Sequence, residues 1–177
     1  MVQVVSLEYA KTQIRNIPDF PKAGIQFKDI TTLLKQPELL TFLIDTIVES
    51  YREKSITKVV CIESRGFILG GAIAARLGAG FVPIRKPGKL PAEVFRKEYS
   101  LEYGIDAIEI HKDAVQSGDI LLLHDDLLAT GGTALAALEL LENFSPAKTY
   151  LSFLCELDFL HGRKALADYE INTLIHF

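Results

Sequence analysis

The chain has 177 residues, of which 49% are apolar, and a formal net charge of −4. This length can bury the core of one domain, and the acidic balance argues against a general nucleic-acid-binding protein. The N-terminal residues lack a signal peptide's continuous apolar segment, and no stretch approaches the roughly 20 apolar residues that span a bilayer. Cys61 and Cys155 lie in apolar runs, where reduced, packed thiols are expected. These features predict a soluble, cytoplasmic protein with no membrane or nucleic-acid partner.

Helical and strand-like segments alternate along the chain, without an internal repeat or a low-complexity linker. Residues 39–54 have apolar side chains at helical spacing, and 58–64 form a short β-branched run that ends in polar residues. The same reasoning predicts five later elements, namely a helix at 66–78, strands at 80–86 and 119–126, a helix at 133–144 and a strand at 148–157. This alternation favours an α/β fold with a mostly parallel central sheet flanked by helices. Ligands of such sheets bind at the carboxyl ends of the strands.

Polar residues follow the first two predicted strands at that edge. Ser64, Arg65 and Gly66 end the first strand, where arginine offers a charged fork for phosphate oxygens and glycine allows close backbone approach. Taken alone, this segment favours an ordinary strand-to-helix turn. Arg85, Lys86 and Lys89 follow the second strand, and the stretch 85–99 has five basic and two acidic residues. These cations form either an anion-binding site or a solvated face.

The third predicted strand runs into two adjacent carboxylates, Asp125 and Asp126, and then into the turn Thr-Gly-Gly-Thr at 130–133. Backbone N–H groups at a helix start are unpaired and partially positive, so they favour a phosphate. The aspartates would repel that phosphate directly, but they can accept hydrogen bonds from nearby hydroxyls. Together these groups predict a site for a ribose 5-phosphate, with a simple capped turn as the alternative. The Walker and dinucleotide-binding glycine patterns are both absent.

Several segments resemble one enzyme family. LLLHDDLLATGGT resembles the phosphoribosyl pyrophosphate motif of the type I phosphoribosyltransferases. Four other segments narrow the resemblance to the adenine-using branch, namely DFPKAGIQFKDITTLL, ESRGFILG, VPIRKPGKLP and SLEYGIDAIEIHKDA. The resemblance covers nearly the whole chain in order. This chain departs from the family pattern at His124, where the family usually has an apolar residue, and at Lys28, where an arginine is common. It implies transfer of a 5-phosphoribosyl group from phosphoribosyl pyrophosphate to adenine, giving AMP and pyrophosphate.

The resemblance also implies roles for the polar residues at the strand ends. Asp125 and Asp126 would face the ribose hydroxyls, and the 5-phosphate would lie in the loop of Ala129, Thr130, Gly131, Gly132 and Thr133. Pyrophosphate would be bound by Ser64, Arg65, Gly66, Arg85, Lys86 and Lys89, with Arg65 also counted as catalytic. Members of the family are homodimers, in which the cluster from Arg85 to Lys89 reaches the neighbouring subunit's pyrophosphate. A cis peptide bond is expected between Glu63 and Ser64.

The resemblance further implies one domain over 1–177, with an N-terminal hood at about 1–35 and a flexible lid loop at about 87–107. The adenine-binding residues would be Ile25, Phe27, Lys28 and Leu160. The lid carries Tyr103 and Glu102, which is the expected general base, and its closure would keep water from the ribosyl cation. Mg²⁺ would arrive on the pyrophosphate and need no protein ligand, and the four histidines show no metal-ligand spacing.

Two alternative functions remain at this point. One is a sister purine transferase for guanine, hypoxanthine or xanthine. The other is a ligand-sensing regulator of DNA or RNA binding that keeps the ribose-phosphate motif. Pyrophosphate release, measured with each base in turn, would separate these functions from adenine transfer.

Overall fold

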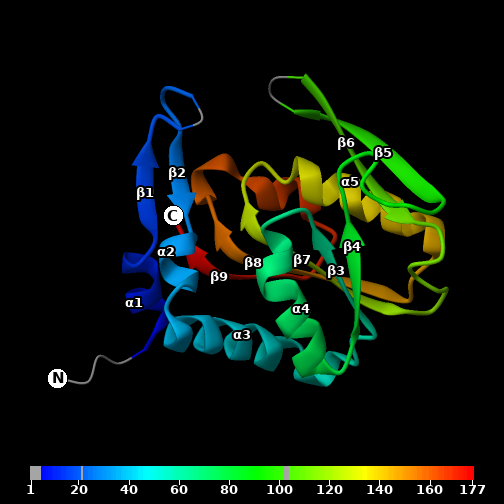
Figure 1. Ribbon diagram of the computed structural model, residues 1–177, viewed down its shortest axis with the longest axis horizontal. Coiled ribbons are helices and arrows are strands. Elements are labelled where there is room, and N and C mark those ends of the chain that lie inside the picture. The colour runs from blue at the N-terminus through cyan, green and yellow to red at the C-terminus, as the bar shows by residue number, and fades with distance from the viewer. Residues whose placement is uncertain (1–4, 21, 102–103) are drawn as a thin grey trace. The chain divides into compact units, whose positions relative to one another are not determined.

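The computed structural model describes residues 5–20, 22–101 and 104–177 (Figure 1). The chain divides into two compact units, Met1–Thr46 and Ile47–Phe177. The first unit contains α1 (Leu7–Thr12), the antiparallel strands β1 (Arg15–Pro18) and β2 (Gln26–Asp29), α2 (Thr31–Leu34) and most of α3 (Pro37–Tyr51). None of the helices in the described ranges is both long and apolar enough to cross a bilayer.

An aspartate joins the elements of the first unit. Asp29 is 8% exposed, and its Oδ1 accepts a hydrogen bond from the backbone N–H of Thr31 at 2.9 Å. Its Oδ2 accepts one from Arg15 Nη2 at 2.5 Å. Hydrogen bonds from the side chains of Thr31 and then Arg15 lower the pKa of Asp29 to about 2. The ionised carboxylate therefore links β1 and β2 to the start of α2.

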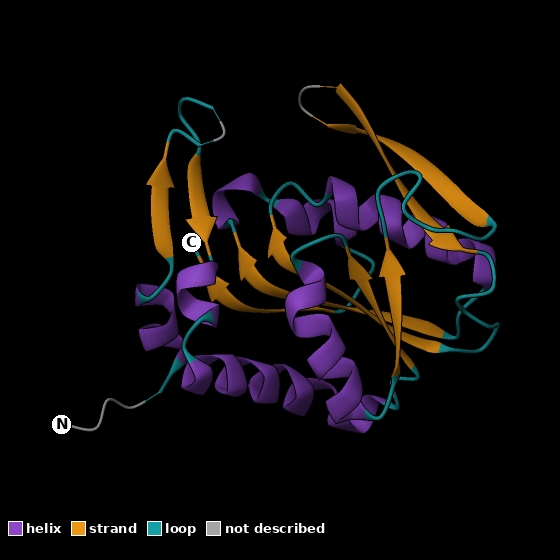
Figure 2. Cartoon of the chain, viewed as in Figure 1, coloured by secondary structure: helices purple, strands orange, loops and turns teal. Residues whose placement is uncertain are grey.

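The second unit is built on a five-stranded sheet in which every neighbouring pair is parallel (Figure 2). Its strands, in spatial order, are β4 (Gly80–Ile84), β3 (Lys58–Ile62), β7 (Ile120–Leu128), β8 (Lys148–Glu156) and β9 (Ile171–His176). The chain passes from β3 to β4 on one side and later returns to β7 on the other side. This reversal at β3 and β7 opens a crevice at their carboxyl ends, where ligands of such sheets bind.

Helices α4 (Gly66–Leu77) and α5 (Gly132–Leu141) cover opposite faces of this sheet. In β3, Val60 and Ile62 pack in one core with α5, whereas Cys61 meets Gly70 of α4. The alternation of side chains along a strand explains the two faces. At the end of α3, the Tyr51 hydroxyl donates to the Leu151 carbonyl of β8 at 2.7 Å. The predicted parallel sheet with flanking helices is therefore confirmed.

The chain between β4 and β7 has more regular structure than the sequence indicates. Residues 87–107 were expected to form a loop, but β5 (Val94–Leu101) and β6 (Gly104–His111) pair as an antiparallel hairpin. The base of the hairpin packs against α5 and the residues that follow it. Phe95 packs edge-to-face with Phe144 at 5.3 Å, and Lys97 forms an ion pair with Glu139 of α5 at 2.7 Å. Strand β9 also lies outside the predicted elements.

Candidate active site

The switch point between β3 and β7 brings two predicted groups together. Asp125 and Asp126 lie near the end of β7, and Arg65 directly precedes α4. Arg65 Nε lies 3.1 Å from Asp126 Oδ2, and the Asp126 side chain is 6% exposed. A residue expected to bind pyrophosphate is thus ion-paired with a residue expected to bind the ribose.

The acid pair is electrostatically unfavourable in the absence of a ligand. Burial, and then the charge of Asp126, raise the pKa of Asp125 well above its ordinary value. Burial also raises the pKa of Asp126, although the Arg65 guanidinium opposes that shift. Hydroxyl donors or a cation placed against the ionised carboxylates would replace the hydration that burial removes. This pair is therefore suited to binding a diol.

The turn after β3 brings α4 against β7. The peptide bond between Glu63 and Ser64 is cis, as expected. A Cβ atom on Gly66 would lie 2.9 Å from the His124 carbonyl oxygen and 3.0 Å from Asp125 Oδ1. Gly66 therefore lets α4 pack closely against β7, and its expected contact with pyrophosphate stays a prediction. The glycine lets Arg65 sit beside the acid pair.

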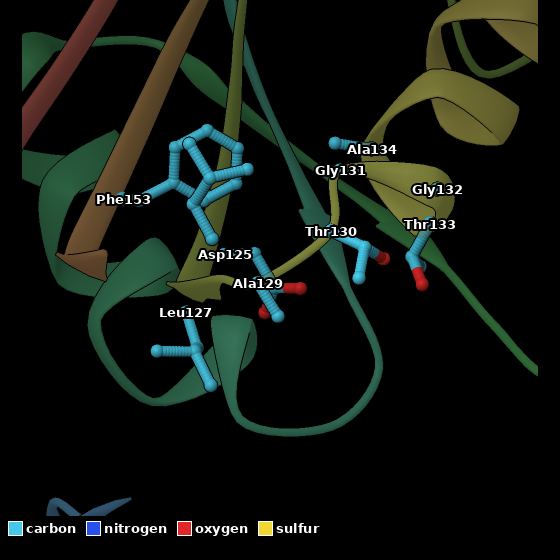
Figure 3. Close-up of a pocket in the computed structure, with 10 residues that line it drawn as sticks. Asp125, Leu127, Ala129, Thr130, Gly131, Gly132, Thr133, Ala134 and Phe153 are labelled. Atoms are coloured by element: carbon cyan, nitrogen blue, oxygen red, sulfur yellow. The ribbon is translucent and has the colours of Figure 1, made fainter. Parts of the chain in front are cut away.

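The phosphate loop is the turn that joins β7 to α5. All five predicted residues, Ala129 to Thr133, line a pocket together with Asp125 and Phe153 (Figure 3). Gly131 precedes the first turn of α5 with φ of 85°, in the left-handed region that glycine adopts readily. The first N–H groups of α5 have no partners within the helix, so they are available to an anion.

A second glycine, missed by the sequence analysis, holds this loop in place. A Cβ on Gly131 would lie 2.6 Å from the Gly162 carbonyl oxygen, and a Cβ on Gly162 would lie 2.3 Å from the Ala129 carbonyl oxygen. Gly162 begins the short helix Gly162–Leu166, one residue after the short helix Asp158–Leu160, whose last residue is a predicted adenine contact. The only sequence signal for this contact was a glycine within the polar run HGRK, and that pattern does not indicate that the glycine packs against the phosphate loop.

Two residues of the basic cluster, Arg85 and Lys86, are paired with acids that the sequence analysis also missed. Arg85 Nη2 lies 3.2 Å from Glu63 Oε1, and the backbone N–H of Lys86 donates to Glu63 Oε2 at 2.9 Å. Burial raises the pKa of Glu63, but hydrogen bonds from Arg85 and Lys86 outweigh it and the pKa is lowered. Lys86 Nζ forms an ion pair with Asp106 of β6. Neither pair is adjacent in sequence, so only the fold reveals them.

The predicted base and lid residues are only partly described. Ile25, Phe27 and Lys28 belong to the first unit, where Ile25 is 41% exposed and Lys28 Nζ donates to Asn16 Oδ1 at 3.1 Å. Phe27 packs edge-to-face against Phe20 at 5.2 Å. Glu102 and Tyr103 lie outside the described residues, so their roles stay predictions.

His124, the departure from the family pattern, is a core residue. It is fully buried in β7, and its Nδ1 lies 3.2 Å from the Ser152 hydroxyl of β8. Burial lowers its pKa to about 4, so the imidazole is neutral near pH 7. Its Nε2 has no hydrogen-bond partner among the described residues. The histidine therefore has a packing role directly before the acid pair.

One cluster has metal-ligand spacing that the sequence analysis did not anticipate. Ligand atoms of Glu156, Asp158 and His176 lie within 4.8 Å of one another, at the ends of β8 and β9. Both carboxylate oxygens of Glu156 accept from Arg163 Nε at 2.9 Å, and Thr173 donates to Glu156 at 2.9 Å. Because Arg163 already balances this carboxylate, the cluster is best described as an ion-pair network.

Comparisons with known proteins agree with this site. Residues 29–173 match the family described as phosphoribosyl transferase domain. An adenine phosphoribosyltransferase of Phocaeicola vulgatus is 56% identical over 97% of this chain and 99% of that protein. The crystal structure of an adenine phosphoribosyltransferase from Thermoanaerobacter pseudethanolicus is 49% identical, with a TM-score of 0.94 over 97% of this chain and 100% of that one.

A third relative has ligands in its site. The adenine phosphoribosyltransferase of Saccharomyces cerevisiae, solved in complex with an imino-altritol bisphosphate and adenine, is 41% identical. Its TM-score is 0.89 over 95% of this chain and 97% of that chain. Identity at this level over nearly the full length of each relative establishes common descent. The chain belongs to the adenine phosphoribosyltransferase family.

Proposed function

We propose that the protein transfers the 5-phosphoribosyl group of phosphoribosyl pyrophosphate to adenine, releasing AMP and pyrophosphate. The observation that carries this proposal is the position of the phosphate loop, which begins α5 directly beside the acid pair and Arg65. A 5-phosphate, a ribose diol and a pyrophosphate are then accommodated by neighbouring groups at one edge of the sheet. The family membership of the chain supports the same reaction.

In this mechanism the protein binds and orients the reactants. The N–H groups at the start of α5 hold the 5-phosphate, and Asp125 and Asp126 accept hydrogen bonds from the ribose hydroxyls. Arg65 balances the charge that develops on pyrophosphate as it leaves. We also propose Glu102 as the base that accepts the ring proton of adenine, with Tyr103 in the lid. Ile25, Phe27, Lys28 and Leu160 are the proposed adenine contacts.

We propose Mg²⁺ as the cofactor, carried by the pyrophosphate group. Mg²⁺ prefers oxygen ligands and usually keeps several waters, so phosphate oxygens and water can fill most of its shell. No protein ligand is required in this arrangement, so Asp125 and Asp126 stay assigned to the ribose hydroxyls. The ion would neutralise the leaving group.

A homodimer in the cytoplasm completes the proposal. Ile68 of α4 is 48% exposed and Phe81 of β4 is 41% exposed, and the Phe81 ring packs edge-to-face with Phe67 at 5.6 Å. These neighbouring apolar side chains suit a symmetric interface. Cys61 and Cys155 are both buried, and neither thiol is part of a disulfide, which fits a reducing compartment.

Phe81→Glu is expected to convert the dimer to a monomer, because a charge would be buried at the interface. The mass in solution, measured by light scattering after gel filtration, checks this. Leu135→Glu is a matched control, since Leu135 is 37% exposed on α5, which covers the sheet face opposite α4. A Phe81→Glu protein that stays dimeric would remove this face from the interface.

Pyrophosphate release with different bases tests the reaction itself. We expect kcat/KM for adenine to exceed that for hypoxanthine more than about tenfold, because a carbonyl that accepts from the exocyclic amino group would face another acceptor. An unpaired buried polar group costs roughly 1–3 kcal/mol, and tenfold is about 1.4 kcal/mol. Preference for a 6-oxopurine would identify a sister transferase. Ligand binding without pyrophosphate release in the presence of any base would favour the regulator.

A further inference from the structure

The ammonium group of Lys86 is bound by the hairpin of its own chain. Lys86 follows the end of β4, and its Nζ forms an ion pair with Asp106 and lies 3.4 Å from the hydroxyl of Tyr99. Tyr99 and Asp106 are register partners in β5 and β6, and the Tyr99 hydroxyl lies 3.2 Å from Asp106 Oδ2. The three groups thus form a closed triangle of contacts.

This triangle extends to the phosphate loop. Thr133 Oγ1 lies 3.5 Å from the Tyr99 hydroxyl. The base of the hairpin is held on α5 by the Lys97–Glu139 ion pair, 2.7 Å long. Because Asp106 lies on this anchored hairpin, it is poorly placed to follow Lys86 toward a ligand elsewhere at the sheet edge. Lys86 would therefore exchange Asp106 for a ligand oxygen.

The two oxygen atoms that contact Lys86 Nζ resemble the oxygens that a bound phosphate group would offer it. Asp106 provides a negatively charged oxygen, and Tyr99 provides a second, neutral one. The side chains of Lys86 and Asp106 are 40% and 28% exposed, so an incoming anion can reach the pair. Burial lowers the pKa of Lys86, but the hydrogen bond to Asp106 and the neighbouring charges raise it overall. The lysine is thus charged, and its charge is balanced before substrate binds.

We propose that Asp106 competes with pyrophosphate for Lys86, and so weakens pyrophosphate binding and speeds its release. This inference rests on the proposed function, because it takes Lys86 to be a pyrophosphate ligand. Asp106 is then a positioning residue, which acts on the substrate only through the lysine. Tyr99 supports the competing arrangement from the opposite strand.

Calorimetric titration of the full-length protein with inorganic pyrophosphate tests the proposal. Asp106→Asn keeps the side-chain shape and removes the charge, and it is expected to lower the Kd about two- to fivefold, the range of a partly exposed ion pair. The matched control is Glu98→Gln on β5, which removes the same charge from a residue 60% exposed and paired with Arg96 at 2.9 Å. The control should leave the Kd unchanged.

Tighter binding separates competition from structural damage, which would weaken binding. A Kd that is unchanged or higher in Asp106→Asn, or equal tightening in Glu98→Gln, would overturn the proposal. In a Lys86→Gln background, Asp106→Asn should have no further effect, and a persistent tightening there would also overturn it. A protein that binds pyrophosphate but releases none from phosphoribosyl pyrophosphate with any base would count against the proposed function alone. A protein that does not bind pyrophosphate would remove both.

Discussion

Asp125→Asn is expected to weaken binding of phosphoribosyl pyrophosphate while stabilising the ligand-free protein. A hydrogen bond to a charged group contributes roughly 1.5–3 kcal/mol, so its loss corresponds to about a ten- to hundredfold increase in Kd. The stability gain follows from burial, which raises the pKa of Asp125 above its ordinary value of 3.8. At neutral pH the folded protein bears the cost of a buried charge, and the asparagine removes that cost.

The sign of this effect can be followed with pH. A carboxyl group with a raised folded pKa favours the folded state at low pH, and that contribution is lost as pH rises through the folded pKa. The stability advantage of Asp125→Asn should therefore be small near pH 4 and grow toward pH 7. Thermal unfolding across this range, with calorimetry of ligand binding, checks both effects. Asp113→Asn, at an exposed position, should change neither, and a destabilised Asp125→Asn protein would contradict the argument.

Gly131→Ala is expected to lower kcat/KM by about a hundredfold, because misplacing a substrate-binding group by about 1 Å can have an effect of that size. Two independent features oppose the new methyl group. Gly131 has φ of 85°, and the added Cβ would lie 2.6 Å from the Gly162 carbonyl oxygen. The start of α5 must therefore move, and the protein should lose roughly 2–4 kcal/mol of stability.

A control separates the two features of Gly131. Gly78 ends α4 with φ of 68°, but a Cβ there would meet nothing within 4 Å. Gly78→Ala should lower stability through backbone strain and leave the steady-state kinetics unchanged. If Gly131→Ala shows wild-type kinetics, the contact with Gly162 does not position the phosphate loop.

The sequence was most informative where structure is determined locally. The apolar run before Asp125 and the glycine turn after it specify a strand, a carboxyl edge and a helix start with short-range signals. Arg65 comes directly after the strand now labelled β3, so the parallel sheet predicts that its guanidinium lies at the carboxyl edge. The prediction of β3, β4, β7 and β8 rests on the same reasoning.

The remainder depends on partners distant in sequence. Strand β5 reads VFRKEYSL, with charges between its apolar residues, and its pairing is apparent only beside β6. Neither Glu63 nor Asp106 carries a sequence signal that points to the basic residue it neutralises. The contact of Gly162 with the phosphate loop cannot be predicted from sequence either, because it involves backbone carbonyl oxygens, which every residue has.

Two glycines of α4 limit how this site can evolve. Gly66 and Gly70 lie one helical turn apart, and a Cβ on Gly70 would lie 2.1 Å from Cys61 Sγ. Any larger residue at either position would force the helix away from the strands and move Arg65 with it. Gly66, Gly70 and the arginine that they position are therefore expected to stay fixed. Changes in substrate preference, whether natural or engineered, should accumulate instead in the β5–β6 hairpin and the first unit.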